Sequence, residues 1–591
     1  MNDRYRGFIL GAALLILIGA SRADAQTRNR VDNRGKEFRI AFLLTNGADN
    51  APHLALDIAA EKPTTGTLTY VHTGQVVPIP LLQPNVPVRI ELDTTELMLP
   101  DPARYPISNF TVYLKFSDEV VVYGMNTQRW SSDNFLALPY EVLGTEHVVL
   151  SYPNTIDPNP AAAVTRASDF PSQFAVVAME DNTQVTVEPS ARLKGRPDTG
   201  PFTITLNAGE VYFAQANGRA GTDVTGSVVR STKRVVVYGS HQRANIPWDE
   251  AVGRDHLVEQ LPPVNRWANR AIVTPHYQLP KTVNDRNLFR VLAAQDNTQI
   301  FFDSVFQTTL NARQFAEYDL DGPKMITATG PILVAQFHHS SVDEKFVSRP
   351  NDSVGDPFMM LATAPEQFDS VYWFESYASK DFTDHFVNVV IPTERVSSLL
   401  LDGFPVSVQF AQVGRSSYSF AEIPVSIGFH KMSARAPFGM YAYGFGVYNS
   451  YGAPGAMVFD SLFKDQKEPS LAWKDSCGGA AGYALDDGPL DFGVESMRLL
   501  SGSANVRLEV DPFTPGKDSV HFRIPLIDPY QDGEADVMVV DTAGLRRHYT
   551  FPVKGFTVAM VVGQTAPVQL DTLASLNGQE FCRTITLTNY G

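Results

Sequence analysis

The chain has 591 residues, of which 44% are hydrophobic and 19% charged, and its formal net charge is −16. A chain of this length is too long for one domain and can bury several cores. The negative charge argues against nucleic acid or an anionic membrane surface as a partner, because both repel an acidic protein. The 41 glycines and 40 prolines occur throughout, as expected where many turns join short strands.

The first 25 residues have the pattern of a signal peptide. Arg4 and Arg6 form a positive start, residues 7–20 are apolar, and residues 23–25 (Ala-Asp-Ala) provide the small residues of a cleavage site. An uncleaved membrane anchor is the alternative, although the apolar stretch is short for a span. Residues 26–35 are polar and basic, and we expect them to be disordered. The sequence therefore predicts an exported chain, secreted or at the cell surface, with no transmembrane segment after cleavage.

The tetrapeptide Asp-Asn-Thr-Gln occurs twice, at residues 181–184 and 296–299, each time between two β-rich apolar runs. This arrangement predicts a hairpin in each copy. A later apolar strand also recurs at roughly 100-residue spacing, which indicates one module used repeatedly. Its four copies are Val120–Tyr123, Val235–Tyr238, Ile332–Ala335 and Phe438–Tyr441. We therefore expect four β-repeats, at about residues 36–150, 170–275, 285–375 and 385–462.

The predicted fold class is all-β. Each repeat has room for about six or seven short strands, which suits a β-sandwich. We therefore predict tandem β-sandwich-like repeats. A four-fold, propeller-like ring is the alternative, because four repeats could close in a circle. Repetition of this kind favours binding or scaffolding over single-pocket chemistry.

The repeat pattern ends near residue 464, and short alternating strands continue beyond it. They predict a small Ig-like β-sandwich over residues 468–575. Residues 576–591 look like the start of a further, truncated β-module, so we expect the chain to be a fragment of a longer surface protein. The two cysteines, Cys477 and Cys582, could form a disulfide, which export would permit.

Three separated stretches carry a family resemblance. Residues 255–263 read Asp-His-Leu-Val-Glu-Gln-Leu-Pro-Pro and precede Trp267, residues 355–359 read Gly-Asp-Pro-Phe-Met, and residues 437–455 are rich in Gly and Tyr. Together with the two Asp-Asn-Thr turns, they resemble the IgGFc-binding protein N-terminal domain family over about residues 36–462. The resemblance implies a secreted, non-enzymatic adhesive or mucus-type module, in a family named for a vertebrate relative that binds the Fc part of immunoglobulin G. The cysteines that many members carry before the Asp-His-Leu motif are absent from residues 244–254.

Asp255, His256 and Glu259 form the first candidate site, because they combine acid and base groups in one short segment. No nucleophile motif accompanies them, so hydrogen bonding between modules is the favoured interpretation and a hydrolase site is the alternative. His338, His339, Asp343 and Glu344 have metal-ligand chemistry. They lack further ligands at a recognisable spacing, and we predict no metal and no cofactor.

The second candidate is an aromatic cluster, for which core packing and an exposed contact surface are the two interpretations. Its candidate ligand-binding members are Tyr441, Tyr443, Tyr448 and Tyr451. The Asp-Asn-Thr turns are explained by backbone chemistry, since Asp and Asn hydrogen-bond their own turns and tolerate left-handed conformations. Residues 528–536 contain several carboxylates but lack the order of a calcium loop, which favours a plain turn.

The sequence thus favours an exported, non-enzymatic binding or adhesion protein that acts through repeated β-modules at the cell surface. The expected partner is an extracellular protein or a glycan, and no nucleic acid. The alternatives are the hydrolase noted above and a structural stalk of a larger surface protein.

Overall fold

The computed structural model describes residues 31–46, 52–155, 170–249, 253–276, 287–340, 355–377, 381–459, 468–476, 478–486, 493–513, 517–541, 546–555, 559–562 and 586–589. It divides into two compact units, Met1–Leu462 and Phe463–Gly591. The predicted signal peptide lies outside the described residues. Almost all regular structure is β-strand, which confirms the predicted all-β fold class.

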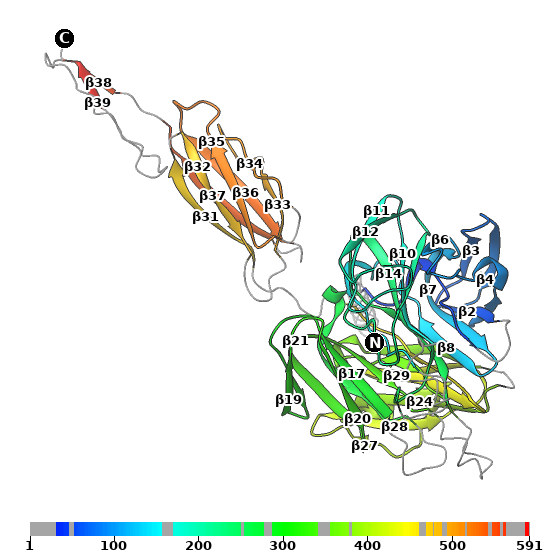
Figure 1. Ribbon diagram of the computed structural model, residues 1–591. Helices are drawn as coiled ribbons and strands as arrows, with labels where there is room; N and C mark the ends of the chain where they lie inside the picture. The colour runs from blue at the N-terminus through cyan, green and yellow to red at the C-terminus, as the bar shows by residue number, and fades with distance from the viewer. Residues whose placement is uncertain are drawn as a thin grey trace, which may run out of the picture. The chain divides into compact units, whose positions relative to one another are not determined.

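The first unit contains four antiparallel sheets, coloured from blue to yellow in Figure 1. The first sheet consists of β1 (Gly35–Ile40), β2 (His53–Ala60), β3 (Thr64–Tyr70), β4 (Val76–Leu82), β5 (Val88–Glu91), β7 (Val112–Gln128) and β8 (Ser131–Leu136). The second consists of β6 (Ile107–Ser108), β9 (Gly144–Val148), β10 (Ser172–Ala178), β11 (Thr183–Glu188), β12 (Phe202–Leu206), β13 (Val211–Gln215), β14 (Val228–Ala244) and β15 (Asp255–Leu261).

The third sheet consists of β16 (Ala268–Val273), β17 (Asn287–Ala293), β18 (Thr298–Phe302), β19 (Val305–Leu310), β20 (Phe315–Leu320), β21 (Lys324–Phe337) and β22 (Met359–Leu361). The fourth consists of β23 (Asp369–Ser376), β24 (Asp384–Pro392), β25 (Leu400–Leu401), β26 (Phe404–Pro405), β27 (Ala411–Gln412), β28 (Tyr418–Pro424), β29 (Gly428–Gly446) and β30 (Asn449–Pro454). Short 3-10 turns occur at η1 (Thr94–Glu96), η2 (Val264–Arg266), η4 (Pro365–Gln367) and η5 (Thr393–Ser398).

All four sheets follow one plan around a long central strand. The plan is clearest in the strand orders β4-β3-β7-β2-β5, β12-β11-β14-β10-β13, β19-β18-β21-β17-β20 and β26-β25-β29-β24-β28. One half of the long strand also pairs with a lead-in strand (β1, β9, β16 or β23), and the other half with an inner strand (β8, β15, β22 or β30). The four repeats predicted from sequence are therefore four copies of one sheet.

The lead-in strands shift the repeat boundaries relative to the sequence-based ones. β9 pairs with β14 of the second sheet, although it falls inside the predicted first repeat. In the same way β16 joins the third sheet and β23 joins the fourth. Each repeat therefore begins at its lead-in strand, before the first strand that carries a repeated motif. A lead-in strand has no distinctive motif, so only its pairing assigns it to a repeat.

The two Asp-Asn-Thr-Gln segments form identical turns. Asn182 and Asn297 have φ angles of 54° and 57°, in the left-handed region that Asn tolerates better than most residues. The carboxylates of Asp181 and Asp296 accept hydrogen bonds from the backbone N–H groups of Ala208 and Ala312, at 2.9 and 3.0 Å. This bond joins each turn to a Leu-Asn-Ala segment downstream, at residues 206–208 in the second repeat and 310–312 in the third. The repeated tetrapeptide is thus explained as a structural turn.

The four inner strands contact one another in cyclic order. β8 packs against β15 and β30, and β22 packs against the same two strands from the other side. Every residue of all four inner strands is buried. The tandem β-repeats therefore close into a ring around these strands, so the first unit has the cyclic closure of the alternative architecture.

Residues 31–33 close the ring, contrary to the disorder predicted for residues 26–35. Asp32 forms an antiparallel bridge with Val458, and the N–H of Asn33 donates to the carbonyl of Met457 at 3.0 Å. The N–H of Phe459 donates to the carbonyl of Val31 at 2.7 Å. The disorder predicted from composition is therefore wrong for residues 31–33. A polar segment becomes ordered when its backbone groups form hydrogen bonds with another segment, here residues 457–459. Residues 26–30 lie outside the described residues.

The second unit contains two small antiparallel sheets. One has the order β31-β32-β35-β34 and the other β33-β36-β37, with a shared core that includes Phe522, Ile524 and Val537. Their strands are β31 (Ser470–Ser476), β32 (Gly479–Leu485), β33 (Val494–Leu499), β34 (Glu509–Val510), β35 (Ser519–Pro525), β36 (Gly533–Asp541) and β37 (Arg546–Val553). Two sheets that enclose one core form a sandwich, as the alternating sequence predicts.

The C-terminal strand has a partner. β39 (Thr586–Asn589) pairs in parallel with β38 (Ala559–Val562). Residues 586–589 thus form a strand within the stretch predicted to begin a further β-module, and that module stays a prediction. Cys477 and Cys582 lie outside the described residues, so their disulfide stays a prediction.

Candidate functional site

Asp133 connects all four repeats at the centre of the ring. Its Oδ1 accepts hydrogen bonds from the backbone N–H groups of Asn134 (2.9 Å) and Gly452 (3.2 Å). Its Oδ2 accepts from Val258 (3.0 Å) and Met359 (3.4 Å). These four donors belong to the four inner strands β8, β30, β15 and β22. A single carboxylate thus satisfies one amide of each repeat, in a place that water does not reach.

Asp255, the first predicted site residue, connects the inner strands in the same way. Its carboxylate accepts hydrogen bonds from the N–H groups of Ser132, His256 and Ser450, the last two at 2.8 and 2.9 Å. The hydroxyl of Ser450 donates to the same carboxylate at 3.3 Å. Asp255 is fully buried and is therefore a link between the first, second and fourth repeats.

Glu259 and His256 complete the predicted acid–base group, and both are also buried. Glu259 accepts a hydrogen bond from the N–H of Leu361 in the third repeat at 3.1 Å. The Nδ1 of His256 lies 2.9 Å from the carbonyl oxygen of His241. Burial lowers the pKa of His256 to about 4, which keeps its ring neutral at pH 7.

Burial also dominates the acidity of the central carboxyl groups. It raises the pKa of Asp133, Asp255 and Glu259 well above the usual range, and the backbone N–H donors act in the opposite direction. Neighbouring acids, Asp356 beside Asp255 and Asp133 beside Glu259, raise these pKa values further. The arrangement suits cohesion of the ring, because the carboxyl oxygens face backbone amides and have no exposure to solvent.

Three of the four predicted tyrosines lie in the interior. The hydroxyl of Tyr441 contacts the N–H of Thr363 at 2.9 Å, and that of Tyr443 donates to Asn388 Oδ1 at 2.9 Å. The hydroxyl of Tyr451 lies 2.9 Å from His385 Nδ1. All three side chains are at most 1% exposed, so the core interpretation accounts for them. Ligand contact by these residues and by Asp255, His256 and Glu259 stays a prediction.

Tyr448 differs, because it lies half-buried on the turn between β29 and β30, with a φ of 54°. Its ring meets Trp130 edge-on, with ring centroids 6.1 Å apart. Trp130 occupies the matching turn between β7 and β8, and its side chain is 36% exposed. The sequence analysis missed Trp130, because its turn carries no motif shared with the fourth repeat.

The predicted metal candidates do not come together among the described residues. His338 stacks on Phe358, with ring centroids 5.3 Å apart, and the Nδ1 of His339 lies 2.7 Å from the carbonyl of Ser340. Asp343 and Glu344 lie outside the described residues. Within the described ranges, no three His, Cys, Asp or Glu side chains are grouped to hold a metal ion.

The acidic stretch 528–536 forms a turn. Asp528 accepts a hydrogen bond from the N–H of Tyr530 at 3.0 Å, and Asp532 pairs with Lys554 at 2.7 Å. Asn505 fastens the turn through hydrogen bonds to two of its carbonyls and to the N–H of Asp528. These carboxylates are therefore used by the turn and by a lysine.

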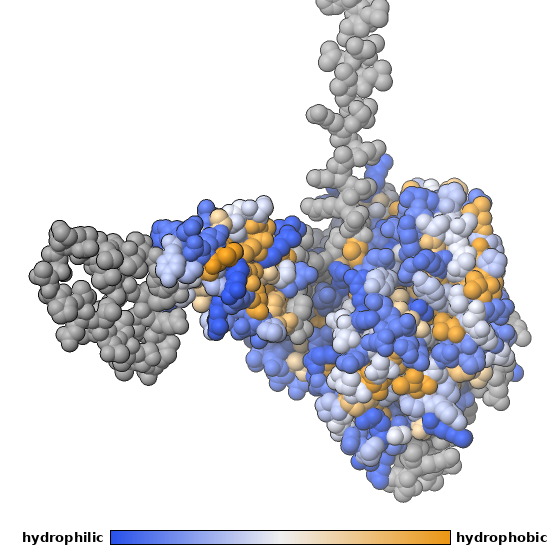
Figure 2. All heavy atoms as spheres, turned by 90° about the horizontal axis from the view of Figure 1, so that it is seen from above, coloured by the Kyte–Doolittle hydropathy of each residue, from blue (hydrophilic) through white to orange (hydrophobic). Residues whose placement is uncertain are grey.

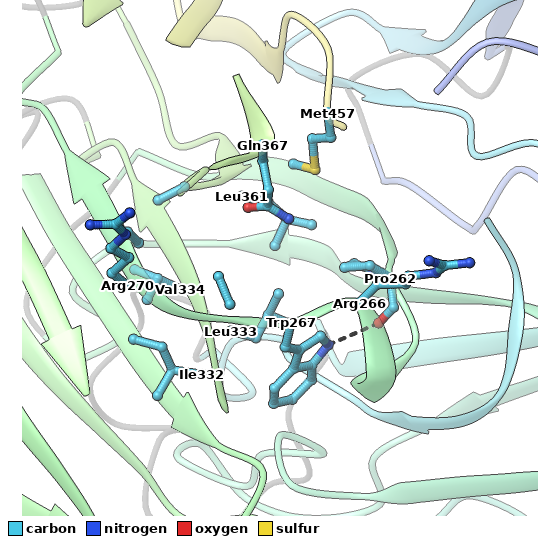
Figure 3. A pocket seen from close by; sticks show the side chains of 13 residues that line it. Pro262, Arg266, Trp267, Arg270, Ile332, Leu333, Val334, Leu361, Gln367 and Met457 are labelled. Atoms are coloured by element: carbon cyan, nitrogen blue, oxygen red, sulfur yellow. Dashed lines mark hydrogen bonds between the residues drawn. The ribbon is translucent and has the colours of Figure 1, made fainter. Parts of the chain in front are cut away.

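A narrow pocket lies beside Trp267, the tryptophan of the family motif (Figure 3). The indole N–H of Trp267 donates to the carbonyl of Pro262 at 3.0 Å, and Arg270, Leu361 and Met457 line other parts of the wall. Its volume is about 20 Å³. This volume holds about one water molecule, so the pocket is a packing defect and not a ligand site.

A larger hollow, of about 400 Å³, lies between the first and fourth repeats. Its floor consists of side chains from β2, β5 and β7, and its wall consists of Tyr377, Asp381 and Phe382, which follow β23. The lining residues are His53, Ala55, Arg89, Glu91, Met125, Thr127, Tyr377, Asp381 and Phe382. A volume of this size is typical of small-ligand sites, which span roughly 300–1,000 Å³. The sequence analysis missed this hollow because its floor and wall are about 300 residues apart in the chain.

Arg89 is held rigidly at the edge of this hollow. Its Nε and Nη2 donate to the two carboxylate oxygens of Asp57, at 3.0 and 3.1 Å, and Nη2 also lies 3.3 Å from Glu375. The guanidinium lies over the ring of Tyr377, 4.5 Å from its centroid. Burial raises the pKa of Glu375 to about 9, and the hydrogen bond to Asp57 and the charge of Asp57 contribute to the increase. Asp57 forms the closer contact with Arg89, at 3.0 Å between Oδ1 and Nε.

The family model described as IgGFc binding protein matches residues 133–444, which is more than half of the chain. The chain belongs to this family. The matched segment begins at Asp133 and includes Asp255 and Glu259, so the family match contains the carboxylates that connect the ring. The resemblance inferred from motifs is thereby confirmed.

The human protein named IgGFc-binding protein is 24% identical over 339 residues. These residues are 55% of this chain and only 6% of the human protein, so the chain spans a small part of that relative. Among solved structures, the human desmocollin-1 ectodomain has a TM-score of 0.13 at 10% identity, with 87% of this chain and 97% of that chain covered. The Salmonella alpha-2-macroglobulin has a TM-score of 0.11 at 9% identity, with 90% and 47% covered. Scores this low carry no argument about fold or function.

Across the described residues, no helix has the length and apolar character that a membrane span requires. Figure 2 shows one face of the molecule, on which hydrophobic side chains occur in small groups between hydrophilic ones.

Proposed function

We propose that the chain is an exported binding protein that attaches to an extracellular protein or glycan at the cell surface through side chains on the outside of its repeat ring. Membership of the IgGFc binding protein family supports a binding role. The observation that carries the proposal is the use of the central carboxyl groups. Three buried carboxyl groups accept hydrogen bonds from backbone amides of neighbouring repeats, and so they hold the ring together. They belong to Asp133, Asp255 and Glu259.

Binding is tested directly with the full chain. It is immobilised and exposed to a glycan array and to a panel of purified extracellular proteins, and captured ligands are titrated by surface plasmon resonance. We expect saturable binding to at least one glycan or protein class. The proposal fails if no titration saturates and every signal equals that of a blank surface.

Capture of immunoglobulin G Fc is a separate question. The human relative's name refers to this ligand, but identity is 24% and the chain spans 6% of that protein. We expect purified Fc to show no binding above background in the same assay. Saturable capture of Fc, displaced by free Fc, would contradict this expectation and would extend the named property to this chain.

The hydrolase alternative makes a distinct prediction about His256. A general base needs access to substrate, whereas His256 is fully buried, with a pKa lowered to about 4. We expect His256→Ala and the unchanged chain to give equal, background rates in screens with ester, peptide and glycoside substrates. A turnover signal that disappears in His256→Ala but persists in the exposed control His72→Ala would support the alternative.

A further inference from the structure

Two segments, one from the first repeat and one from the second, lie side by side along one edge of β13. The N–H of Phe213 donates to the carbonyl of Pro106 in the first repeat, at 2.8 Å. Four residues further along, the N–H of Asn217 donates to the carbonyl of Arg192, at 2.7 Å. The opposite edge of β13 pairs with β10. Both segments therefore occupy the outer edge of this strand, because residues an even number apart bond toward the same side.

These segments and the turn after β13 carry five cationic side chains, which we call the basic row. One β-turn brings three of them together, and in it the N–H of Arg196 donates to the carbonyl of Leu193 at 3.2 Å. Gly195 of this turn has a φ of 75°, and a Cβ there would lie 2.8 Å from the carbonyl oxygen of Ala103. The turn is therefore pressed against the residue that precedes Arg104. The basic row consists of Arg104, Arg192, Lys194, Arg196 and Arg219.

The four arginines of the basic row take part in no ion pair. Across the ranges that the structure describes, none of them lies within ion-pair distance of a carboxylate. Asp101 and Asp198, the acids of the same segments, accept hydrogen bonds from N–H groups of their own turns at 2.9 and 3.2 Å. Elsewhere in the second repeat, by contrast, Arg230 pairs with Glu146 at 2.9 Å and with Glu188 at 2.5 Å. The basic row thus lacks a structural counter-charge, although the net charge of the chain is −16.

Aromatic rings hold two of these arginines in place. The guanidinium carbon of Arg196 lies 3.5 Å from the ring centroid of Phe202, and its Nε is buried without a hydrogen-bond partner among the described residues. The guanidinium carbon of Arg104 lies 5.1 Å from the ring centroid of Tyr105. The other two arginines are exposed, as is Arg104. A stacked guanidinium loses little further freedom when its N–H groups bind a ligand, so the row is prepared for binding.

The charge and the length of the basic row select the ligand class. Unpaired cations repel a cationic ligand, whereas guanidinium groups bind sulfate and carboxylate oxygens through paired N–H donors. A strand rises about 3.3 Å per residue, so the contacts at Phe213 and Asn217 place the two segments roughly 13 Å apart along β13. A row of this length exceeds a single small anion and suits several charges of a linear polyanion.

Two other classes of polyanion fit the row less well. A DNA duplex carries one charge about every 1.7 Å and would extend beyond the row, over a protein whose net charge is −16. An acidic protein needs an interface of roughly 800 Å² on each partner, whereas the basic row follows one strand edge. A single polysaccharide chain is thin enough to contact the row alone. Repulsion from the rest of the molecule is then screened, because the Debye length is about 8 Å at physiological salt.

We propose that the basic row binds a linear polysaccharide whose sugar units carry sulfate or carboxylate groups. The arginines bind these anionic groups, and Lys194, which donates to Gln215 Oε1 at 2.9 Å, adds a fifth positive charge. This inference rests on the proposed binding function and assigns its ligand class and site. The row requires the first and second repeats together, because β13 aligns the segments that carry it.

Two double variants of the full chain test the assignment. Arg104→Ala/Arg192→Ala removes two exposed arginines that form no ion pair, one from each segment. Arg415→Ala/Arg435→Ala removes two exposed arginines of the fourth repeat and is the matched control, because both variants change the net charge equally.

Each protein is titrated by surface plasmon resonance, at low, physiological and high salt, with two anionic ligands. These are heparin oligosaccharides, which carry sulfate, and hyaluronan oligosaccharides, which carry carboxylate alone. Neutral dextran oligosaccharides, a DNA duplex and a poly-glutamate peptide are the comparison ligands. Thermal unfolding checks that each variant is folded.

We expect at least one anionic oligosaccharide to bind the unchanged chain and the control equally, with an affinity that falls as salt rises. Arg104→Ala/Arg192→Ala should raise its Kd by about tenfold or more, because two charge-assisted contacts are lost. Tighter binding of heparin would identify sulfate as the recognised group, and tighter binding of hyaluronan would identify carboxylate.

Three results would contradict this inference. Equal affinity of all three proteins for the anionic oligosaccharide would overturn the site and leave the proposed binding function intact. Dextran, DNA or poly-glutamate that bound the row as tightly as the anionic oligosaccharide would overturn the ligand class. If neither anionic oligosaccharide bound the unchanged chain, this inference alone would fail, since the proposed function fails only when the whole panel of glycans and proteins shows no saturable binding.

Discussion

At the scale of single residues, Asp133 makes the contacts on which the closed ring most directly depends. Its two oxygens accept four backbone hydrogen bonds, one from each inner strand, at 2.9 to 3.4 Å. Removal of a buried acceptor leaves its donors unpaired, which costs more than the net value of the hydrogen bonds themselves. Asp133 is also fully buried, so water cannot replace the lost acceptor without entering the core.

We expect Asp133→Ala to lower the free energy of unfolding by about 3–5 kcal/mol. Urea unfolding followed by tryptophan fluorescence measures the change. Asp198→Ala is the matched control, because Asp198 is exposed and accepts one turn hydrogen bond at 3.2 Å, and its loss should cost less than about 1 kcal/mol. Equal effects of the two substitutions would show that the central hydrogen bonds contribute little.

Arg290 has a comparable role between the second and third repeats. It lies on β17, and its side chain, 3% exposed, pairs with Asp223 and with Glu317 at 2.7 Å each. We expect Arg290→Met to destabilise the first unit by about 3–5 kcal/mol, because two carboxylates lose their buried cation. The double variant Arg290→Met/Asp223→Asn should recover part of the loss. Failure of the second substitution to recover any stability would mean that Arg290 acts through packing alone.

At the scale of elements, the Asp-Asn-Thr-Gln turns show how sequence enforces one hairpin shape. Asn182 and Asn297 adopt positive φ, which costs an Ala residue about 1 kcal/mol but costs Gly nothing. We expect Asn182→Ala/Asn297→Ala to lower stability by about 2 kcal/mol in total, and Asn182→Gly/Asn297→Gly to be nearly neutral. Thermal unfolding separates these outcomes. Equal losses for Ala and Gly would point to the asparagine side chains and not to the backbone.

The closing segment, residues 31–33, is the element that joins the two ends of the ring. It pairs with residues 457–459, and Arg34 beside it reaches Asp369 of the fourth repeat at 3.1 Å. A chain that starts at residue 36 should therefore unfold at a lower temperature than one that starts at residue 31, by several degrees. High salt should reduce this difference in melting temperature only slightly, because backbone hydrogen bonds provide most of the contact. Identical melting curves would contradict closure by this segment.

At the scale of the whole molecule, buried histidines make stability depend on pH. Burial lowers the pKa of His147 and His241 to about 3, from 6.5 in the unfolded chain. Between pH 6.5 and about 3 the unfolded chain therefore takes up protons that the folded chain does not, so stability falls as the pH falls. The buried carboxyls Asp133 and Glu259 have raised pKa values and act in the opposite direction, because the folded chain retains their protons at pH values where the unfolded chain has lost them.

His147 offers the clearest test, because neither ring nitrogen has a hydrogen-bond partner among the described residues. In His147→Phe the stability should fall less steeply with acid, by up to about 1.4 kcal/mol per pH unit between pH 6 and 4. Urea titrations at half-unit pH steps measure the slope. His72→Phe, a substitution at an exposed histidine, is measured alongside as the comparison variant. An unchanged slope in His147→Phe would show that His147 is protonated in the folded state.

Sequence alone determined the β-class, the fourfold repetition and the family. Those properties depend on local patterns, because alternating apolar residues, Asp-Asn turns and a recurring terminal strand are visible within a few residues. The sequence also pointed to Asp255 and Glu259, but their residue types could not distinguish an acid–base role from a structural hydrogen-bonding role. Three of the four tyrosines named as ligand-binding candidates are core residues.

Only the tertiary structure decided how the repeats are joined and where the hollow lies. The inner strands bury every side chain, so polar residues such as Asp133 do not follow an alternating pattern that sequence could reveal. The lead-in strands pair with residues tens of positions away, and the closing segment and the hollow beside Arg89 depend on contacts between residues hundreds of positions apart. Such contacts leave no local periodicity, because each partner is selected by the closed ring and not by its neighbours in the chain.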